Sequence, residues 1–252
     1  MNLEEYRDVE IRSAAALRLF AGMLAALSLA GCGQLTSRIE AEDNRVFLPA
    51  MRAALNLSEG RESPSRPQTG HAVEIGVAGA RGSDRQSLAA GDLPIILNNK
   101  TFSAPQQLRN DFAFYFADIS YRWRKFPGER PLGLEVLAGL GYSSLGLTVS
   151  SPTQRASEHF ATWGPQAGIG LIWRIEPTTS LQARAAGFVS GSSEGANQAT
   201  RFELFLAKAF SENLTLRAGY AGWEVRGDDQ LGTSDFRLRF SGPVLAIDII
   251  AR

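Results

Sequence analysis

The feature that most constrains this chain is a change of hydrophobic period at about residue 70. From there onward apolar side chains recur at every second position, as in Val73, Ile75 and Val77. Because successive side chains of a strand point to opposite faces, this period predicts strands with one apolar face. Eight segments carry the pattern, at 73–78, 112–123, 134–143, 163–174, 181–189, 201–206, 214–221 and 236–249. Gly242-Pro243 interrupts the last segment and predicts a bulge that exchanges its two faces.

The connections between these segments alternate strictly between long and short. The long ones are 82–110, 144–160, 190–200 and 226–235, and the short ones are 125–130, 176–179 and 211–213. Short turns at one end and long loops at the other are typical of barrels in outer membranes. We therefore predict an all-β fold, an eight-stranded antiparallel up-and-down barrel over residues 70–252. An even strand number would bring both ends of this domain to the short-turn side.

The two faces of the segments differ in chemistry. Aromatic residues lie toward the ends of the apolar faces, as expected of an aromatic girdle at a membrane interface: Tyr121, Trp123, Tyr142, Trp163, Trp173 and Tyr220. The opposite face is rich in Gly, Ala and charged residues. Side chains fill the interior of an eight-stranded barrel, and buried charges must pair. We predict a structural polar network inside the barrel, formed by Glu74, Asp118, Arg122, Glu135, Arg174, Arg184, Glu203, Arg217, Arg237 and Arg239.

The N-terminal segment carries an apolar run at 19–30 that follows Arg12 and Arg18. The run is too short to span a bilayer, and it fits the apolar region of a secretory signal. It ends in Leu29-Ala30-Gly31-Cys32, which resembles the lipobox of bacterial lipoproteins. That resemblance implies a signal peptide over residues 1–31 and a lipid attached to Cys32. Gly33, where retained lipoproteins have Asp, implies export to the outer membrane.

Residues 32–69 lack strand alternation in the sequence and are interpreted as a linker. Apolar residues near helical spacing predict a short amphipathic helix around 37–57, through Ile39, Val46, Phe47, Met51, Ala54 and Leu55. Ser, Pro and Gly between 58 and 69 indicate a flexible tether.

Residues 70–252 resemble the small eight-stranded outer-membrane barrels of Gram-negative bacteria in their pattern of strands and loops. The resemblance implies a non-enzymatic role in envelope structure, or surface interaction with a protein or small molecule through the long loops. Within the loop 82–110, Leu93-Pro94-Ile95-Ile96-Leu97 is an apolar patch that would mark a contact site or fold back over the barrel mouth. The expected location is the outer membrane, with Cys32 anchored in lipid on the periplasmic side.

Two alternatives remain open. The chain ends in Ile249-Ile250-Ala251-Arg252, whereas outer-membrane barrels usually end in an aromatic residue. A periplasmic lipocalin-like lipoprotein, with the apolar face turned inward around a lipid, is therefore the first alternative. The second is a lipid A-modifying enzyme, for which Ser157-Glu158-His159 supplies the only local set of acyl-transfer residues.

Composition excludes several other classes. The 26 basic and 26 acidic side chains balance, so the chain lacks the basic face that nucleic-acid binding requires. Two His and one Cys are too few for a Cys/His metal site, which usually takes three or four such ligands. We find no cofactor-binding motif and expect no cofactor and no metal.

Overall fold

The computed structural model describes residues 38–43, 46–57, 70–127, 131–191, 197–211, 213–227 and 234–251. The predicted signal peptide (1–31), Cys32 and the predicted tether (58–69) lie outside these residues. Among the described residues, no helix is long and apolar enough to cross a membrane.

Every regular element in the described residues is a strand, which confirms the predicted all-β class. The strands are β1 (Ile39–Asp43), β2 (Leu48–Asn56), β3 (Gly70–Leu88), β4 (Ile95–Leu97), β5 (Lys100–Phe102), β6 (Gln106–Lys125), β7 (Leu132–Ser150), β8 (Arg155–Glu176), β9 (Thr179–Val189), β10 (Gln198–Ala209), β11 (Leu214–Gly227) and β12 (Phe236–Ala251).

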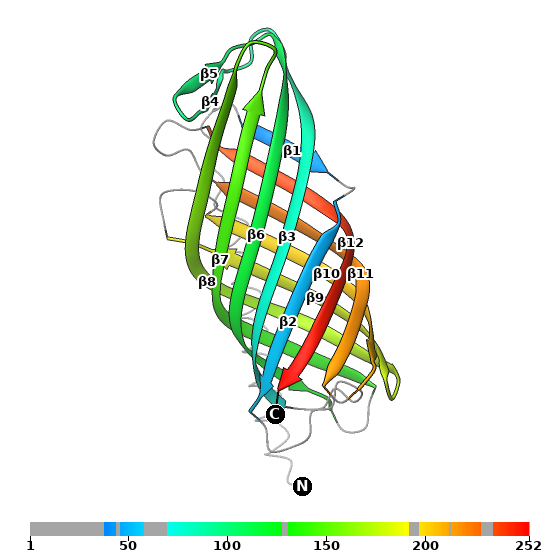
Figure 1. The fold of residues 1–252 in the computed structure, drawn as a ribbon. Helices are drawn as coiled ribbons and strands as arrows, with labels where there is room; N and C mark the ends of the chain where they lie inside the picture. Colours follow the sequence, from blue (N-terminus) through cyan, green and yellow to red (C-terminus); the bar gives the residue numbers. More distant parts are fainter. Residues whose placement is uncertain are drawn as a thin grey trace, which may run out of the picture. The chain divides into compact units, whose positions relative to one another are not determined.

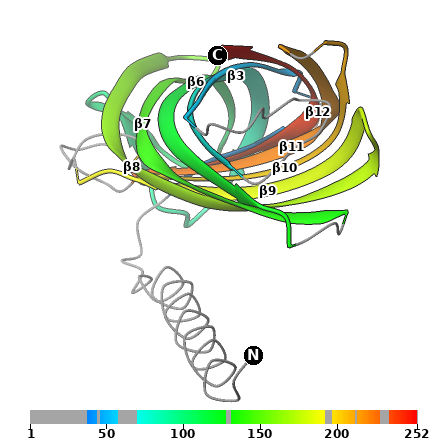
Figure 2. The ribbon, with the colours of Figure 1, turned by 90° about the horizontal axis from the view of Figure 1, so that it is seen from below.

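Nine of these strands form a closed ring (Figures 1 and 2). From β3 through β6–β12, each strand pairs antiparallel with the next. β2 pairs antiparallel with β3 and parallel with β12, from Leu48 opposite Val244 to Leu55 opposite Ala251, and this parallel pair closes the ring. β1 extends the parallel pairing along the first part of β12 and is the tenth strand of the sheet. The predicted eight-stranded up-and-down barrel is therefore wrong in strand number and in closure.

The segment that supplies the additional strands is the one predicted to be helical. In β1, Ile39 and Ala41 are buried while Glu40 between them is exposed, and in β2 Arg52 is buried while Met51 is exposed. The helix predicted over 37–57 is therefore wrong. Apolar side chains of this segment lie on both faces of the sheet, at different levels. Their combined spacing imitates a helical period and hides the strand alternation.

The inward face changes character along the length of the ring. We call the end where β12 begins the upper end and the end where it finishes the lower end (Figure 1). On β6 the inward residues from Leu108 to Phe116 are apolar except for Asn110, and those from Asp118 to Arg124 are polar or charged. The outward residues of the same strand change in the opposite sense, from Arg109 and Asp111 to Ile119 and Tyr121. The upper half thus has an apolar interior, and the lower half has a polar one.

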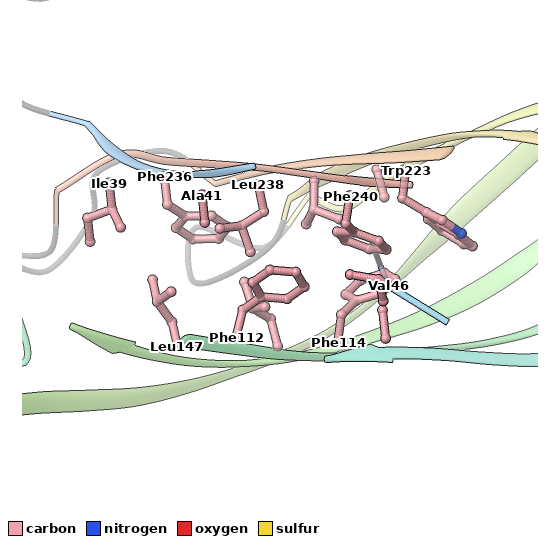
Figure 3. Close-up of a cluster of buried hydrophobic side chains, with 14 of the residues drawn as sticks. Ile39, Ala41, Val46, Phe112, Phe114, Leu147, Trp223, Phe236, Leu238 and Phe240 are labelled. Atoms are coloured by element: carbon pink, nitrogen blue, oxygen red, sulfur yellow. The ribbon is translucent and has the colours of Figure 1, made fainter. Parts of the chain in front are cut away.

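Aromatic side chains from opposite walls fill the upper half (Figure 3). The rings of Phe112 and Phe114 each lie 5.3 Å from that of Phe240, and Trp223 lies 5.2 Å from Phe114 between ring centroids. Ile39 of β1 joins this core beside β12. Contacts of this kind are the ordinary content of a packed protein interior.

The β4–β5 hairpin covers the upper end of the ring. Ile95 and Leu97 are completely buried, and so is Phe102 on β5. The backbone amide of Ser234 donates to the carbonyl of Ile96 at 2.8 Å, which fastens the hairpin beside the start of β12. The apolar patch 93–97 was predicted either to form an exposed contact site or to fold back over the barrel mouth. Ile95 and Leu97 do the second, because both are buried.

β12 keeps one alternation from end to end. Its register with β11 runs without a shift from Phe236 opposite Gly227 to Ile249 opposite Leu214, so the face exchange predicted at Gly242-Pro243 does not occur. Gly242 points inward, where a Cβ atom would lie 1.8 Å from the carbonyl oxygen of Val46. Glycine at this position permits the close approach of the chain between β1 and β2.

Candidate functional site: a buried charge network beneath an apolar belt

Glu74 is the centre of the polar interior. Its carboxylate accepts hydrogen bonds from Arg122 Nη1 and Arg184 Nη1, each at 2.8 Å, and from Arg52 Nη1 at 3.5 Å. These residues come from β2, β3, β6 and β9, so the cluster joins strands on different sides of the ring. All four side chains are at most 5 % exposed.

The network extends from Glu74 through shared arginines. Arg184 also pairs with Glu135 at 2.6 Å, and Arg124 Nε donates to the same carboxylate at 2.6 Å. Arg52 pairs with Glu203 at 2.7 Å. Two more pairs, Arg201–Asp118 and Arg217–Asp248, complete the charged interior in the described part of the chain. Six buried arginines thus face five buried carboxylates.

The structure brings seven of the ten residues predicted for this network together in the interior: Glu74, Asp118, Arg122, Glu135, Arg184, Glu203 and Arg217. Sequence reasoning missed Arg52, Arg124, Arg201 and Asp248. Arg124 and Arg201 have the same parity as Arg122 and Glu203, so the alternation itself contained the signal. Arg52 was hidden by the helical interpretation of its segment.

Arg174 lies at the lower end and has a different partner. Its guanidinium carbon is 4.4 Å from the centroid of the Phe126 ring, a cation–π contact. Phe126 is buried, and it packs so closely on Gly133 that a Cβ atom there would be 2.4 Å from the ring. Arg174 and Phe126 therefore contribute to the packing of the lower end.

Arg237 and Arg239 lie on the outside of the ring, so their predicted place in the interior is wrong. The prediction assumed that the apolar residues opposite them, Phe236, Leu238 and Phe240, face outward, but these side chains are buried in the interior. Both arginines donate to the Glu224 carboxylate, at 3.0 and 3.1 Å, and Arg226 pairs with it from β11. Partial burial of Glu224 opposes its ionisation, but Arg226 and Arg237 outweigh this and hold the pKa of Glu224 below its usual value.

The outer surface of the lower half is a belt of exposed apolar side chains. It covers all nine strands of the ring, although β9 contributes mostly small residues. Its larger aliphatic members are Met51, Leu55, Ile75, Val77, Ile119, Leu132, Leu134, Val136, Leu140, Ile169, Leu171, Leu204, Leu206, Leu214, Leu245, Ile247 and Ile249. We call these residues, with the aromatic residues among them, the apolar belt. The belt surrounds the same part of the ring that holds the charge network.

Aromatic residues mark the two margins of the belt. Trp163 and Trp173 on β8 are 68 % and 53 % exposed, and Tyr115 and Tyr220 lie at the upper margin on β6 and β11. Ten residues separate the two tryptophans, about 33 Å of strand at ~3.3 Å per residue. A strand tilt of ~40° reduces this to about 25 Å along the ring axis, which is the height of the apolar band in outer-membrane barrels.

The predicted acyl-transfer residues do not form one site. Ser157 bonds to Thr148 Oγ1 at 2.9 Å, and Glu158 belongs to the inward-facing set of β8. His159 points outward, and its Nε2 lies 3.0 Å from the hydroxyl of Ser144 on β7. The strand pairing, which sequence spacing does not reveal, therefore gives His159 a different serine.

Comparisons with known proteins return no counterpart: no protein-family profile, no curated protein and no solved structure matches this chain. In the described part of the chain, no group of His, Cys, Asp or Glu side chains has the arrangement of a metal site.

Proposed function

We propose that this protein is an outer-membrane β-barrel lipoprotein whose lower half spans the bilayer and whose lipid is attached to Cys32. The observation that carries the proposal is the coincidence of the apolar belt with the buried charge network in one stretch of the ring. A soluble protein of this composition would turn its charges outward and its large apolar side chains inward. The lower half has the reverse arrangement, which suits a lipid environment.

The extent of the belt argues against the lipocalin-like alternative. Soluble monomers rarely expose contiguous apolar patches larger than a few hundred Å². The belt encircles the ring, and it includes large side chains that are mostly accessible, such as Trp163 and Phe202, each at least 60 % exposed. In addition, arginine–carboxylate pairs occupy the interior of the lower half, where a lipocalin-like protein would bind an apolar ligand.

The filled interior supports a role without transport. Phe126 packs at the lower end, the charge network fills the lower half, and aromatic residues fill the upper half beneath the β4–β5 hairpin. We infer a structural or surface-interaction role in the cell envelope, with partners that bind the polar upper half.

The parallel closure supports a proposal for the side on which the lipid would lie. β1 begins at the upper end, whereas β12 finishes at the lower end. Seven residues separate Cys32 from Ile39, and at ~3.5 Å per residue they reach at most about 24 Å. The lower end lies farther away, because Phe236–Ile249 of β12 alone extends about 33 Å along the axis at a tilt of ~40°. The lipid and the upper half therefore belong on the same side, and anchoring on the periplasmic side places the upper half in the periplasm.

A fractionation experiment tests the proposal. Membranes containing wild-type protein or Cys32→Ala are washed with carbonate, extracted with detergent and run on gels with and without boiling. We expect both proteins to stay in the washed membranes and to migrate faster unboiled, because the barrel holds the chain in the bilayer without the lipid. Release of Cys32→Ala as a soluble protein with no mobility shift would favour the lipocalin-like alternative.

A further inference from the structure

The outer wall of the ring carries a serine–histidine pair at the upper margin of the apolar belt. Ser144 Oγ on β7 lies 3.0 Å from His159 Nε2 on β8. Within the described residues this is the one hydrogen bond of the His159 ring, and no carboxylate holds its Nδ1 atom. The pair therefore has the nucleophile and the base of an acyl-transfer site without the third, orienting group.

The surroundings of the pair distinguish it from a chance contact on a polar surface. Toward the lower end, Tyr142 is the next outward residue on β7 after Ser144, and it pairs across the strands with Trp163, which follows Ala161 on the outer face of β8. The rings of Tyr142 and Trp163 are tilted against each other, with centroids 4.8 Å apart. Tyr115 on β6 stands in cross-strand register with Ser144. Its hydroxyl accepts a hydrogen bond from Arg81 Nη2 at 2.8 Å, which leaves its own proton available to a substrate.

From this geometry we propose that Ser144 and His159 hydrolyse carboxylic esters of membrane lipids at the boundary between hydrocarbon and head groups. The inference rests on the proposed function, because it requires the belt to be in the bilayer. The adjoining rings of Tyr142 and Trp163 would contact the acyl chain, and the Tyr115 hydroxyl, on the residue in cross-strand register with Ser144, would donate to the ester oxygen. In the proposed orientation the pair faces the periplasmic leaflet, so phospholipid esters are the expected substrate; the esters of lipopolysaccharide, in the opposite leaflet, would be reached only in the reverse orientation.

The reaction balances with water as the only co-reactant. Ser144 Oγ attacks the ester carbonyl carbon while His159 Nε2 takes the hydroxyl proton. The bond to the lipid alcohol breaks, and His159 returns that proton to the departing oxygen, which leaves an acyl-serine. Water then attacks the acyl carbon and gives a proton to His159, the bond between that carbon and Ser144 Oγ breaks, and His159 returns the proton to Ser144 Oγ as the fatty acid leaves. Ser144 is 8 % exposed in this structure, so we expect slow turnover.

The first test uses detergent-solubilised full-length protein and a fluorophosphonate probe, which labels only activated serines. We expect labelling at Ser144, its loss in Ser144→Ala and at least a 100-fold slower rate in His159→Gln. Ser157→Ala is the matched control, because Ser157 is on β8 near His159 but bonds to Thr148; its labelling should equal that of the wild type. No labelling of the wild type, or equal labelling of Ser144→Ala, would overturn the proposal.

The second test identifies the substrate. The same proteins are reconstituted into vesicles of phosphatidylethanolamine, with or without lipopolysaccharide, and released fatty acid is measured by mass spectrometry. Release that requires Ser144, in either vesicle, supports the proposal and names the source. Fluorophosphonate labelling without release from either vesicle would refute lipid-ester hydrolysis. Failure of the protein to insert into vesicles would count against the barrel proposal, while the labelling in detergent still decides whether Ser144 is activated.

Discussion

At the scale of single residues, the stability of the lower half depends on mutual pairing of buried charges. Glu74 contacts three arginines, and each of these arginines is itself nearly inaccessible to solvent. A buried ion pair contributes little net stability, because desolvation offsets attraction, but removing one partner leaves an uncompensated charge. The network is therefore a strong constraint on which strands can be neighbours.

Glu74→Gln should destabilise the ring by about 3–5 kcal/mol, because it leaves Arg52, Arg122 and Arg184 with one carboxylate fewer. Urea unfolding in detergent micelles, followed by tryptophan fluorescence, measures the change. The control is Glu224→Gln, which removes an equally well-paired carboxylate on the outside and should cost less than about 1 kcal/mol. Equal losses of stability in the two variants would mean that water solvates the interior charges, so that the buried ion pairs are no more sensitive to substitution than the exposed ones.

The alternation of odd and even positions along each strand shows which parts of the charge network the sequence could predict. The period of two placed Glu74, Arg122 and Arg184 on the correct face, because their strands have a continuous apolar outer face in the lower half. It failed at Arg237 and Arg239, where the interior is apolar and the exterior is charged. An alternation identifies two faces, but it does not say which of them is inside once the interior changes character along the strand.

At the scale of elements, β1 and β2 decide how the sheet closes. The parallel pairing of β2 with β12 makes the ring nine-stranded and brings Arg52 into the interior, and β1 pairs in the same direction with the first part of β12. The backbone amides of Glu40 and Glu42 donate to the side chains of Gln86 and Asp84, at 3.1 and 2.9 Å. β1 is thus fixed to β12 by backbone pairing and to β3 by side chains. Sequence periodicity could not predict this closure, because two short strands with mixed faces resemble a helix.

Cysteine cross-linking tests the closure. Met51 and Ile247 are paired across β2 and β12 and both point outward, so in a Cys32→Ala background the pair Met51→Cys with Ile247→Cys should form a disulfide on mild oxidation. The control pair, Val77→Cys with Ile247→Cys, is separated by β2 and should not. Cross-linking of the control pair instead would indicate direct β3–β12 closure, as in an eight-stranded barrel.

A substitution at Gly242 tests the close approach between β12 and the backbone of Val46 that accompanies this closure. Gly242→Ala should cost about 1–3 kcal/mol, because its Cβ atom would meet the Val46 carbonyl and backbone must shift. Gly222→Ala on the neighbouring strand is the control, since a Cβ there has only ordinary contact at 3.7 Å, with Ser241. Thermal unfolding of both variants in the same micelle provides the comparison, and an unchanged midpoint for Gly242→Ala would contradict the packing described here.

At the scale of the whole molecule, the same strands form two halves in which the apolar and the charged side chains occupy opposite faces of the sheet. The upper half has the ordinary arrangement of a soluble protein, with Phe112 and Trp223 inside and Arg226 and Arg239 outside. The lower half reverses it, with Glu74 inside and the apolar belt outside. The period of two identifies eight of the nine strands of the ring, but it assigns each of them a single apolar face. Periodicity is evaluated strand by strand, and the reversal appears only when inward residues are compared along the axis.

The position of β1 predicts the orientation of the molecule in the envelope. A cysteine at Ser87, in the upper half, should react with a membrane-impermeant maleimide only after the outer membrane is permeabilised. A cysteine at Lys125, at the lower end, should react in intact cells. The proposed acylation would leave Cys32 itself unreactive, and protein without a new cysteine is the control for any labelling at Cys32. The reverse pattern would contradict periplasmic anchoring together with the upper half.

The central claim is that the lower half lies in lipid, and a spin-label scan along the outer face of β8 tests it most directly. Single nitroxides are placed at positions 155, 157, 169 and 171 of Cys32→Ala protein in liposomes, and collisions with oxygen and with a water-soluble nickel chelate are compared. We predict that oxygen dominates at Ile169 and Leu171, within the belt, and that the chelate dominates at Arg155 and Ser157, above it. Chelate-dominated collisions at all four positions would contradict the claim.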